Sequence, residues 1–282
     1  MQIKIFVPGR FEKRKGLCVR YVYDNDLHIH SKISLCSGDE EQTNERILEY
    51  AKRNNLKTIC LTDHFWDENT AGASDWYALQ NFEHISKAKP LPQAEGIKFP
   101  FGCETEMDKD MTIGISKERF DDFDFVVIPT THFHMTDFTI PQDCVSPKQK
   151  ADFWLKKLNV LLDMDLPFHK IGLAHMTCEL MDKSRENFLE IIKELKCDYL
   201  KAVFKKAAVK GNGFELNSDD MNFKDEEADI VLKPYKLAKE MGCKFYCGSD
   251  AHHPNGLDAA KDIFERAIDL LELTEDDKFI IR

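Results

Sequence analysis

The sequence lacks a long apolar run and lacks an excess of positive charge. No stretch of its 282 residues approaches the roughly 18 apolar residues that a membrane-spanning helix needs. The first residues are interrupted by charge too soon to form a signal peptide. A formal net charge of -11 makes extended nucleic acid an unfavourable partner, because a polyphosphate requires a basic stripe. A small anionic substrate is compatible with this charge, since a metal cluster supplies positive charge of its own.

Paired cysteine motifs are missing as well. The nine cysteines include no CxxC pair, and their spacing does not repeat. Cys60, Cys103 and Cys247 lie in or beside apolar runs, where a thiol behaves as a small hydrophobe. An odd number of unpaired cysteines predicts reduced thiols. Together with the missing membrane segment, this pattern predicts a cytoplasmic protein that does not associate with membranes.

Linkers and internal repeats are also absent. No Pro/Gly/Ser-rich segment divides the chain, and no repeat of roughly 20 to 50 residues is visible. We therefore expect one domain over residues 1–282. Residues 1–22 are expected to form an N-terminal extension, as an extra strand or hairpin before the main fold.

Short apolar runs alternate with amphipathic stretches along the chain. Seven runs rich in Val, Ile, Phe and Cys are typical of strands: one ending near His28 and His30, then 58–62, 99–103, 125–129, 171–174, 213–216 and 244–247. Helices are expected at 41–54, 148–164, 187–195, 228–241 and 258–271. This alternation predicts an α/β fold with parallel strands, and so many strands favour a closed or nearly closed barrel. The irregular segment 65–97 is expected to form a loop-rich insertion over the barrel mouth.

Polar side chains that can bind metals follow the predicted strands at their C-terminal ends, the edge where barrel enzymes build their sites. In His28–Ile29–His30 the period of a strand places both imidazoles on one face, so both can reach one ion. Imidazole and carboxylate together suit Zn, Fe and Mn. The candidate ligands are His28, His30, His64, Glu104, His132, His175, Asp250 and His252. This set exceeds the needs of one ion and predicts two or three divalent metal ions.

For any single histidine, a hydrogen-bonded surface position is the competing interpretation. Eight of the ten histidines, all but His84 and His169, fall at strand ends. That distribution favours a metal site for the set as a whole. The surface interpretation stays open for His134, His253 and Asn217.

The order of these residues resembles the PHP (polymerase and histidinol phosphatase) family. The matching elements run from about Tyr23 to Leu270: Asp26-x-His28-x-His30, Thr62-Asp63-His64, Gly102-x-Glu104, His132, His175 and Gly248-Ser249-Asp250-x-His252. No single element is specific, but the ordered set is. The resemblance implies a distorted TIM-like (β/α)7 barrel and a trinuclear metal site.

The resemblance also implies which residues would hold each ion. The first ion would be bound by His28, His30, Glu104 and Asp250. Glu104 would bridge to a second ion, which His132 and His175 would also bind, and His64 and His252 would hold a third. Some relatives add a histidine six residues after the second histidine of the opening motif. That position is Cys36 in this chain, so the third ion could be completed by Cys36 or by Asp39.

The function expected from these residues is that of a metal-dependent phosphoesterase. A hydroxide bridging the metals would attack the phosphorus of a small phosphate monoester, because metal coordination lowers the pKa of bound water to roughly 7. Asp250 would orient the hydroxide, and His252 or His134 would protonate the leaving group. Asp26 and Asp63 are interpreted as carboxylates that fix imidazole tautomers.

The substrate is less well defined than the metal site. Histidinol phosphate is the first specific substrate that the resemblance implies. Trp66, Trp76 and Tyr77 could line a pocket or pack as a lid. Candidate cations for the phosphate, each of which could equally be a solvated surface charge, are Arg119, Lys205, Lys206 and Lys210.

Two other classes of function stay open. A phosphodiesterase or nuclease acting on nucleotide ends could use the same metals, although steep salt dependence would be expected of it if it bound long polymers. A noncatalytic PHP-like binding module would keep the fold without turnover. The many clustered ionisable groups argue against the second alternative.

Overall fold

The computed structural model describes residues 19–281. Most of the segment 1–22, where an extra strand or hairpin was expected, lies outside this range. Of its described part, Arg20 forms an isolated antiparallel bridge with Thr274. The backbone N–H of Tyr21 donates a hydrogen bond to the carbonyl of Leu273 at 2.9 Å. The start of the described chain is therefore attached to the segment that follows the last long helix.

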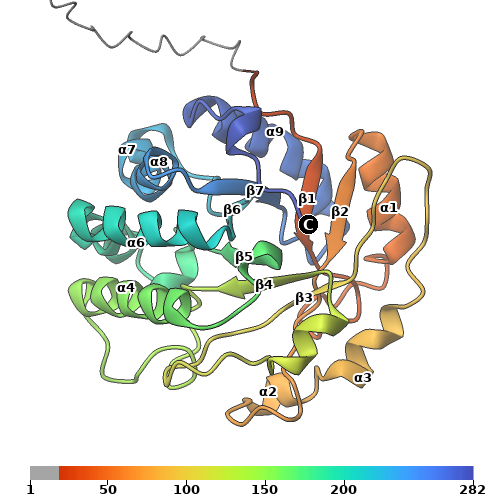
Figure 1. Ribbon diagram of the computed structural model, residues 1–282, viewed down its shortest axis with the longest axis horizontal. Helices are drawn as coiled ribbons and strands as arrows, with labels where there is room; N and C mark the ends of the chain where they lie inside the picture. The colour runs from red at the N-terminus through yellow and green to blue at the C-terminus, as the bar shows by residue number, and fades with distance from the viewer. Residues whose placement is uncertain (1–18, 282) are drawn as a thin grey trace, which may run out of the picture.

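Seven parallel strands form the centre of the described chain (Figure 1). They are β1 (Asn25–Ile29), β2 (Thr58–Leu61), β3 (Gly102–Glu104), β4 (Phe125–Pro129), β5 (Ile171–Ala174), β6 (Gly213–Asn217) and β7 (Lys244–Gly248). β1 pairs with β2, and β3 to β7 form a second sheet in sequence order. The predicted α/β architecture is confirmed.

Two irregular seams join the sheets into a distorted barrel. Isolated parallel bridges link Leu61 to Phe101 and His64 to Glu104, between β2 and β3. Ile29, at the end of β1, bridges Ala251, which follows β7. Both seams lie where the predicted metal ligands leave their strands. At these two seams the strands are joined by isolated bridges and not by a continuous ladder of backbone hydrogen bonds.

Helices cover the outside of the barrel (Figure 1). The longer ones are α1 (Asn44–Arg53), α4 (Pro147–Asp163), α5 (Arg185–Glu194), α6 (Cys197–Lys210), α8 (Lys233–Glu240) and α9 (Pro254–Leu270). The shorter ones are α2 (Asp75–Ala78), α3 (Phe82–Ile85) and α7 (Ala228–Val231). α4 begins at a capping box in which Ser146 and Gln149 satisfy each other's backbone N–H groups, with proline in the first turn.

The observed helices differ from the predicted ones in two places. α6 was not predicted, although Leu200, Val203, Phe204 and Ala207 follow the helical spacing and are buried. The predicted helix 228–241 is divided into α7 and α8 just before Pro234, as expected where a proline begins a new helix. The irregular segment 65–97 contains only the short helices α2 and α3 and a 3₁₀ turn.

Alternate residues of each strand face two different cores. In β4, Phe125 and Val127 point into the barrel, whereas Val126 and Ile128 pack under the helices. Phe279, near the C-terminus, also packs inside the barrel. A Cβ atom at Gly172 in β5 would collide with the ring of Tyr246, so the glycine makes room for that ring. The barrel is thus filled at one end and leaves its other end for polar groups.

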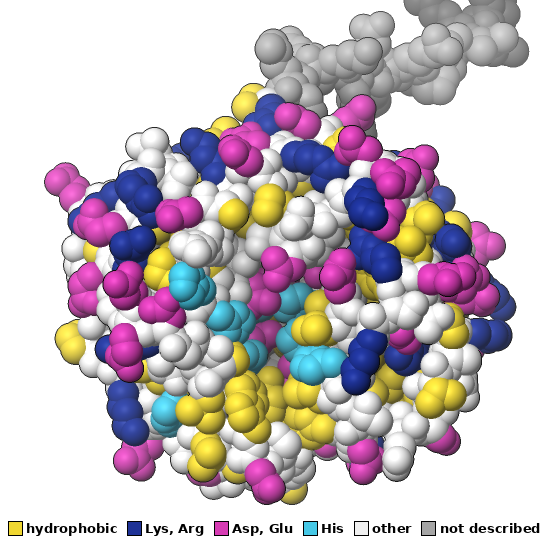
Figure 2. Space-filling model, turned by 180° about the vertical axis from the view of Figure 1, so that it is seen from behind, with side chains coloured by type: hydrophobic (Ala, Val, Ile, Leu, Met, Phe, Trp, Pro, Cys, Tyr) yellow, Lys and Arg dark blue, Asp and Glu magenta, His cyan; other side chains and the backbone are white. Residues whose placement is uncertain are grey.

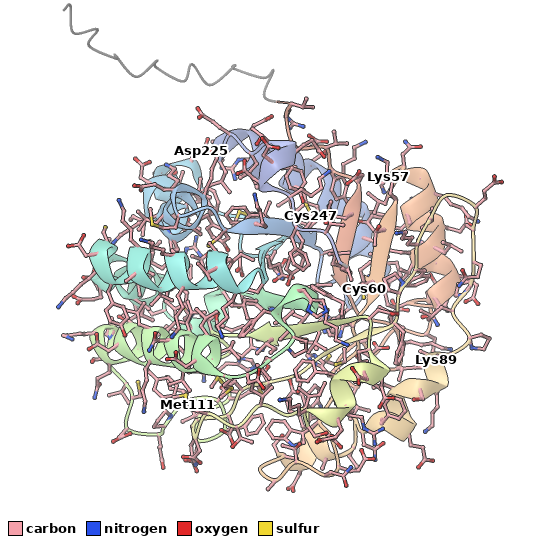
Figure 3. All side chains as sticks on the ribbon, in the orientation of Figure 1. Lys57, Cys60, Lys89, Met111, Asp225 and Cys247 are labelled. Carbon is pink, nitrogen blue, oxygen red and sulfur yellow. The ribbon has the colours of Figure 1, made fainter. Side chains whose placement is uncertain are left out.

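The cysteines match the sequence-based expectation. The eight cysteines in the described range are all free, and six of these (Cys60, Cys103, Cys144, Cys178, Cys243 and Cys247) are at least partly buried. Figure 3 labels Cys60 on β2 and Cys247 on β7. Of the helices described, none combines the length and hydrophobicity that crossing a lipid bilayer demands.

Candidate metal centre

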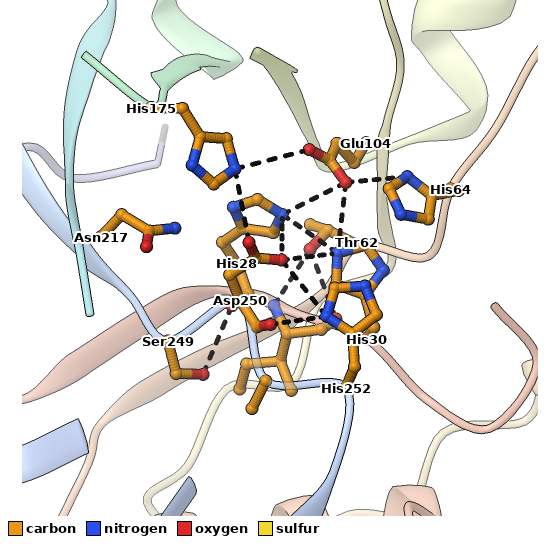
Figure 4. Close-up of polar contacts among 12 residues, drawn as sticks. His28, His30, Thr62, His64, Glu104, His175, Asn217, Ser249, Asp250 and His252 are labelled. Atoms are coloured by element: carbon orange, nitrogen blue, oxygen red, sulfur yellow. Dashed lines mark hydrogen bonds and ion pairs between the residues drawn. The ribbon is translucent and has the colours of Figure 1, made fainter. Parts of the chain in front are cut away.

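All eight predicted metal ligands meet at the C-terminal end of the strands. Figure 4 shows Asp250 and Glu104 among the side chains of His28, His30, His64, His175 and His252, and Figure 2 shows histidines and acids at the bottom of a hollow. Six of the eight residues are buried, and the side chains of Asp250 and His252 are 15% and 30% exposed. The structure therefore brings together side chains from the ends of six strands, β1 to β5 and β7.

The first group consists of His28, His30, Glu104 and Asp250, whose ligand atoms all lie within 4.8 Å of one another. The Nε2 atoms of His28 and His30 are 3.1 Å apart. Glu104 Oε2 lies 3.5 and 3.2 Å from these two nitrogens, and Asp250 Oδ1 lies 3.4 and 3.1 Å from them. Two imidazole nitrogens and two carboxylate oxygens around one point form a suitable donor set for a divalent cation.

Unpaired buried oxygens provide an independent test of whether metal ions fit. Both carboxylate oxygens of Glu104 and Oδ1 of Asp250 are buried without a hydrogen-bond partner. Glu104 Oε2 lies 2.8 Å from His64 Nδ1, but the contact does not have hydrogen-bond geometry. Burying an ionised carboxylate without a partner is costly. Cations bound between these groups would satisfy them, so the residues fit a metal cluster.

The second predicted group is more loosely assembled. His132 lies with Glu104 and Glu106 in one set of close ligand atoms, and with His175 and Cys178 in another. The rings of His132 and His175 are 4.5 Å apart between centroids, and His175 Nε2 is 3.9 Å from Glu104 Oε1. Both ring nitrogens of His175 are buried without a hydrogen-bond partner. Sequence reasoning did not include Glu106 or Cys178 in this group.

The third group contains His30 in addition to the predicted His64 and His252. The ring of His30 stacks on that of His252 at 4.0 Å and lies 4.5 Å from that of His64. Nδ1 of His252 lies 2.7 Å from the carbonyl oxygen of Asp250, which leaves Nε2 as the nitrogen for a ligand.

The two alternatives for completing this third group lie in different places. Cys36 lines the same cavity, but it does not belong to the group of His30, His64 and His252, whose ligand atoms all lie within 4.8 Å of one another. Asp39 does not line the cavity, and its carboxylate lies 2.6 Å from Nε2 of His253. His253 is therefore a surface residue paired with Asp39, in agreement with the surface interpretation.

The carboxylates that orient the imidazoles are not those predicted. Glu215 Oε1 lies 2.6 Å from His28 Nδ1, and Glu106 Oε1 lies 2.6 Å from His132 Nδ1. Asp220 Oδ1 faces His175 Nδ1 at 3.6 Å, too far for a hydrogen bond, so it does not fix the tautomer of this ring as the other two acids can. A carboxylate that accepts the Nδ1–H of an imidazole leaves Nε2 free to bind a metal. All three acids follow or end a predicted strand, which is the signal that could have identified them.

The predicted role of Asp26 was wrong, and that of Asp63 is indirect. Asp26 accepts hydrogen bonds from the backbone N–H of Ser249 and from the hydroxyl of Tyr50, both at 2.9 Å, and it contacts no imidazole. Asp63 accepts a 2.8 Å hydrogen bond from the hydroxyl of Ser34. That hydroxyl lies 2.9 Å from Nδ1 of His30. Asp63 therefore orients His30 through Ser34.

Asn217 also belongs to this supporting layer. Its amide donates a 3.2 Å hydrogen bond to Glu215 Oε2, and its carbonyl oxygen accepts one from the backbone N–H of Asp219 at 2.9 Å. Asn217 thus orients a carboxylate and the loop after β6.

Backbone geometry aims two of the predicted ligands into the centre. His175 and Asp250 have φ angles of 59° and 52°, in the left-handed region that residues with a Cβ atom seldom adopt. Such positions concentrate at functional sites. A Cβ atom at Gly248 would collide with the carboxylate of Glu215 and lie 2.8 Å from Cβ of His28. The glycine of the Gly248–Ser249–Asp250 motif therefore allows Glu215 to reach His28.

The two carboxylates and two of the histidines have the charge states that metal binding requires, whereas nearby acidic groups outweigh burial and raise the pKa of His28, His30 and His175, whose imidazoles must lose a proton to bind a cation. Burial opposes ionisation of Glu104 and Asp250, but the surrounding histidines outweigh burial and hold the pKa of each carboxyl well below its usual range. Burial, reinforced by neighbouring histidines, lowers the pKa of His252 to about 3 and that of His134 to about 4. Both imidazoles are therefore neutral near pH 7. The neutral form of His252 can bind a metal through its free nitrogen. Because neither ring is protonated near pH 7, neither His252 nor His134 is poised to act as a cationic general acid.

A cavity of about 290 Å³ opens above the ligands. Its lining includes Trp76, Tyr77, Met135, His134 and Leu180. Trp66, by contrast, is buried and donates its indole N–H to the carbonyl of Thr70. A larger cavity of about 830 Å³ lies at the opposite end of the barrel and contains none of the predicted ligands. We place the site in the smaller cavity because the ligand atoms converge there.

The candidate phosphate-binding cations lie elsewhere. Arg119 pairs with Glu68 and Asp122 at 3.0 Å, and Lys206 pairs with Asp163 at 2.5 Å. Neither Lys205 nor Lys210 lines the cavity. Within residues 19–281, no lysine or arginine lines it. Any positive charge for a phosphate must come chiefly from bound cations.

Comparison with known protein families decides the classification. The PHP domain model matches residues 26–280 of the chain. The chain belongs to the PHP domain family. The ordered motifs from Asp26 to His252 therefore belong to the matched region, and the resemblance seen in the sequence is confirmed.

Relatives with curated names are phosphatases by description. This PHP domain is 23% identical over 228 residues to a "Probable phosphatase" of Caldicellulosiruptor saccharolyticus, covering 80% of this chain and 79% of the relative. It is 25% identical over 229 residues to a "Probable phosphatase" of Caldicellulosiruptor bescii, covering 81% of this chain and 79% of the relative. With the family match, these relatives support the prediction of a metal-dependent phosphatase.

Solved structures support the barrel fold. The putative histidinol phosphatase HisK of Listeria monocytogenes aligns with a TM-score of 0.63 at 14% identity, over 85% of this chain and 99% of that chain. Histidinol phosphate phosphatase of Lactococcus lactis, solved with zinc, L-histidinol and phosphate, aligns with a TM-score of 0.55 at 16% identity. This second alignment covers 87% of this chain and 94% of that chain. At such low identity, the comparison concerns the fold of this PHP domain alone.

Proposed function

We propose that this PHP domain hydrolyses a small phosphate monoester with two or three divalent cations, zinc, iron or manganese. The observation that carries the proposal is the group His28, His30, Glu104 and Asp250, with unpaired carboxylate oxygens at the floor of a cavity. When bound, such cations lower the pKa of water and neutralise charge on a phosphate. The zinc and phosphate in the Lactococcus lactis relative add support for this chemistry.

Each residue of the centre has a proposed role. His28, His30, Glu104 and Asp250 would bind the first ion, and Glu104 would bridge to a second held by His132 and His175. His64 and His252, joined by His30, would bind a third. Asp250 would also orient the attacking water through its second carboxylate oxygen. These roles require ionised carboxylates, which the lowered pKa values of Glu104 and Asp250 favour, and neutral imidazoles, which the lowered pKa of His252 favours. The raised pKa values of His28, His30 and His175 mean that cation binding would displace protons from these rings.

His134 is proposed to contact the leaving group. It lines the cavity and lies beside His132, with ring centroids 5.5 Å apart. As a neutral imidazole it carries one N–H, which can donate a hydrogen bond to the ester oxygen as negative charge develops there. His252 is better suited to metal binding than to proton donation, because its Nδ1 faces the carbonyl of Asp250.

A monoester fits the cavity better than a nucleic acid. Among the described residues that line it, there is no lysine or arginine to hold a polymer backbone. The cavity volume of about 290 Å³ is near the lower end of the range for small-molecule sites. Histidinol phosphate is the first substrate to test, because the Lactococcus lactis relative was solved with L-histidinol and phosphate, and its ammonium group also tests whether the cavity accepts a charged leaving group.

The proposal is tested by metal analysis followed by a phosphate-release screen. Purified protein should contain at least two equivalents of zinc, iron or manganese, and it should release phosphate from histidinol phosphate or another small monoester. The same screen should include a phosphodiester and a nucleotide. Bound metal without release from any ester would favour a binding module, and preferential diester cleavage would favour a phosphodiesterase.

A further inference from the structure

Two apolar side chains from separate loops remain exposed at the mouth of the catalytic cavity. Trp76 in α2 is 37% exposed, and Leu180 in the 3₁₀ turn Glu179–Met181 is 43% exposed. Both line the cavity, together with Met135. Figure 2 shows hydrophobic side chains along one side of the hollow that holds the histidines. Single exposed apolar residues need no explanation, but several around one cavity mark a binding surface.

Trp76 lies close enough to the metal centre to contact a bound substrate. Its ring centroid is 5.1 Å from that of His64, in an edge-to-face arrangement, and 4.8 Å from that of Tyr77. Tyr77 is buried and donates a hydrogen bond to Glu106 at 3.1 Å, so it forms a fixed support for the indole. An ester whose phosphate lies at the histidines would therefore place its carbon skeleton beside Trp76.

The cavity has little with which to bind a charged leaving group. Apart from the neutral His134, its acids and histidines belong to the metal centre, and its remaining walls are Trp76, Tyr77, Met135, Leu180 and Cys36. Cys36 is an exposed residue, but partial desolvation of its thiol, reinforced by nearby acids, raises its pKa to about 12, so the thiol is not an anion. The side of the cavity away from the histidines is therefore uncharged.

An adjoining cavity of about 310 Å³ shares His134 and Leu180 with the first. Two of its charged side chains neutralise each other, since Lys150 lies 2.7 Å from Asp182. Glu179 forms an ion pair with Arg185. The exposed Lys183 also lines this second cavity, so a distal carboxylate on the substrate is the alternative that an experiment must test.

We infer that Trp76 and Leu180 are specificity-determining residues that hold an uncharged aromatic or other apolar leaving group of the phosphate monoester, an inference that rests on the proposed function. An aromatic ring beside Trp76 would bury apolar surface and gain an edge or stacking contact. A short alkyl ester would leave the indole and Leu180 exposed to water. The preference should therefore depend on the ring of the substrate and not on its phosphate.

The test compares 2-phenylethyl phosphate with ethyl phosphate, two alkyl esters that differ by the ring. The zinc-loaded full chain should prefer the phenylethyl ester in kcat/KM by roughly ten-fold or more, as expected for a ring held in an apolar pocket. Trp76→Ala should remove most of this preference, and Leu180→Ala part of it. Both substitutions should lower kcat/KM for the phenylethyl ester more than for ethyl phosphate, because the shorter ester buries less apolar surface against the two side chains.

Matched controls come from exposed apolar residues that do not line the cavity. Leu79, which caps α2 and is 64% exposed, serves as the control for Trp76. Val209 in α6, which is 84% exposed, serves as the control for Leu180. Leu79→Ala and Val209→Ala should keep the wild-type preference. Circular dichroism should show that all four variants are folded.

Binding of non-hydrolysable phosphonates separates this inference from the proposed function. Calorimetry on the zinc-loaded protein should show tighter binding of 2-phenylethylphosphonate than of ethylphosphonate, with the difference lost in Trp76→Ala. That result supports the apolar subsite even if no ester is hydrolysed. Failure to hydrolyse any ester would overturn the proposed function without bearing on the apolar subsite. Equal affinity for the two phosphonates, or preferential hydrolysis of 3-phosphoglycerate through its distal carboxylate, would overturn the inference.

Discussion

Glu215 and His28 form the most enclosed contact of the metal centre. Their side chains are fully buried, and Glu215 Oε1 lies 2.6 Å from His28 Nδ1. A carboxylate at this distance accepts the Nδ1–H, which leaves the lone pair of Nε2 directed at His30, Glu104 and Asp250. The strand β6 therefore contributes to the site by fixing a ligand rather than by supplying one.

Glu215→Gln should weaken metal binding without removing a ligand. The amide can offer its N–H₂ in place of the acceptor, so the tautomer of His28 is no longer fixed. We expect metal affinity to fall by roughly 10–100-fold, the usual effect of losing such a partner. Competition with a chromogenic chelator measures this change. Glu190→Gln, on the outer face of α5, is the matched control and should bind metal as the wild type does. Unchanged affinity in Glu215→Gln would contradict the role given to Glu215.

Asp250→Ala and His132→Ala should each abolish turnover while the protein stays folded. Each substitution removes a proposed ligand from a loop that follows a strand, and the barrel core is not altered. We expect kcat/KM to fall by more than roughly 100-fold, beyond the usual effect of losing a supporting partner. Phosphate release and circular dichroism provide the two measurements.

The control for these two variants is His253→Ala, which removes an imidazole that is paired with Asp39 and not with the proposed ligands. It should retain activity within a few-fold of the wild type. Full activity in Asp250→Ala or His132→Ala would refute the proposed metal site.

Removal of the metal should destabilise the protein reversibly. Without cations, Glu104 and Asp250 keep buried oxygens that have no hydrogen-bond partner. A ligand that binds only the folded state adds about 2.7 kcal/mol of stability at a free concentration of 100 times its Kd. Thermal unfolding after chelation should therefore occur at a lower temperature, and addition of zinc or manganese should restore both the midpoint and phosphate release. An unchanged midpoint would show that these side chains do not bind metal.

The third ion should depend on His252 and not on Cys36. Cys36 lines the cavity but does not join the close group formed by His30, His64 and His252. We expect Cys36→Ser to keep the metal content of the wild type, whereas His252→Ala should lose one equivalent. Elemental analysis of dialysed protein measures both. Loss of one equivalent in Cys36→Ser would instead assign the thiol as a ligand.

Lys157 should make stability depend on pH in the alkaline range. Its ammonium group is buried in α4 and donates to the carbonyl oxygens of Met107 and Thr139 at 2.7 and 3.3 Å. Burial lowers its pKa to about 8, below the value of about 10.4 in an unfolded chain. Between these values the unfolded chain binds more protons, so the contribution of Lys157 to stability rises with pH and is lost as pH falls toward 8.

The comparison with Lys157→Met isolates this effect, because the other titrating groups are common to both proteins. Between about pH 8 and about pH 10.5, the unfolding free energy of the wild type minus that of the variant should increase by up to about 3 kcal/mol. Urea unfolding at several pH values measures the difference. A difference that does not change with pH would mean that Lys157 has an ordinary pKa in the folded protein.

The sequence predicted ligands better than it predicted their supports. The histidines and acids stand directly after apolar runs, and the C-terminal ends of parallel strands meet at one edge, so position in the sequence was enough to group them. Glu106, Glu215 and Asp220 also end or follow predicted strands, but the sequence does not show which imidazole each acid faces, because that depends on contacts across the barrel. Asp26 lies only two residues before His28 in the sequence, but its carboxylate accepts a hydrogen bond from the backbone N–H of Ser249, the residue that follows β7.

By itself, the sequence determined the α/β class, the approximate positions of the seven strands and the set of eight metal-competent side chains. Strand and helix periodicity are local properties, and the motifs occur in order along the chain. Only the tertiary structure decided which atoms share a centre: that His30 lies with both Glu104 and His252, that Trp76 and Leu180 meet at one cavity, and that Arg119 and Lys206 pair elsewhere. Such contacts join residues far apart in the chain, and they depend on how the barrel closes at its two irregular seams.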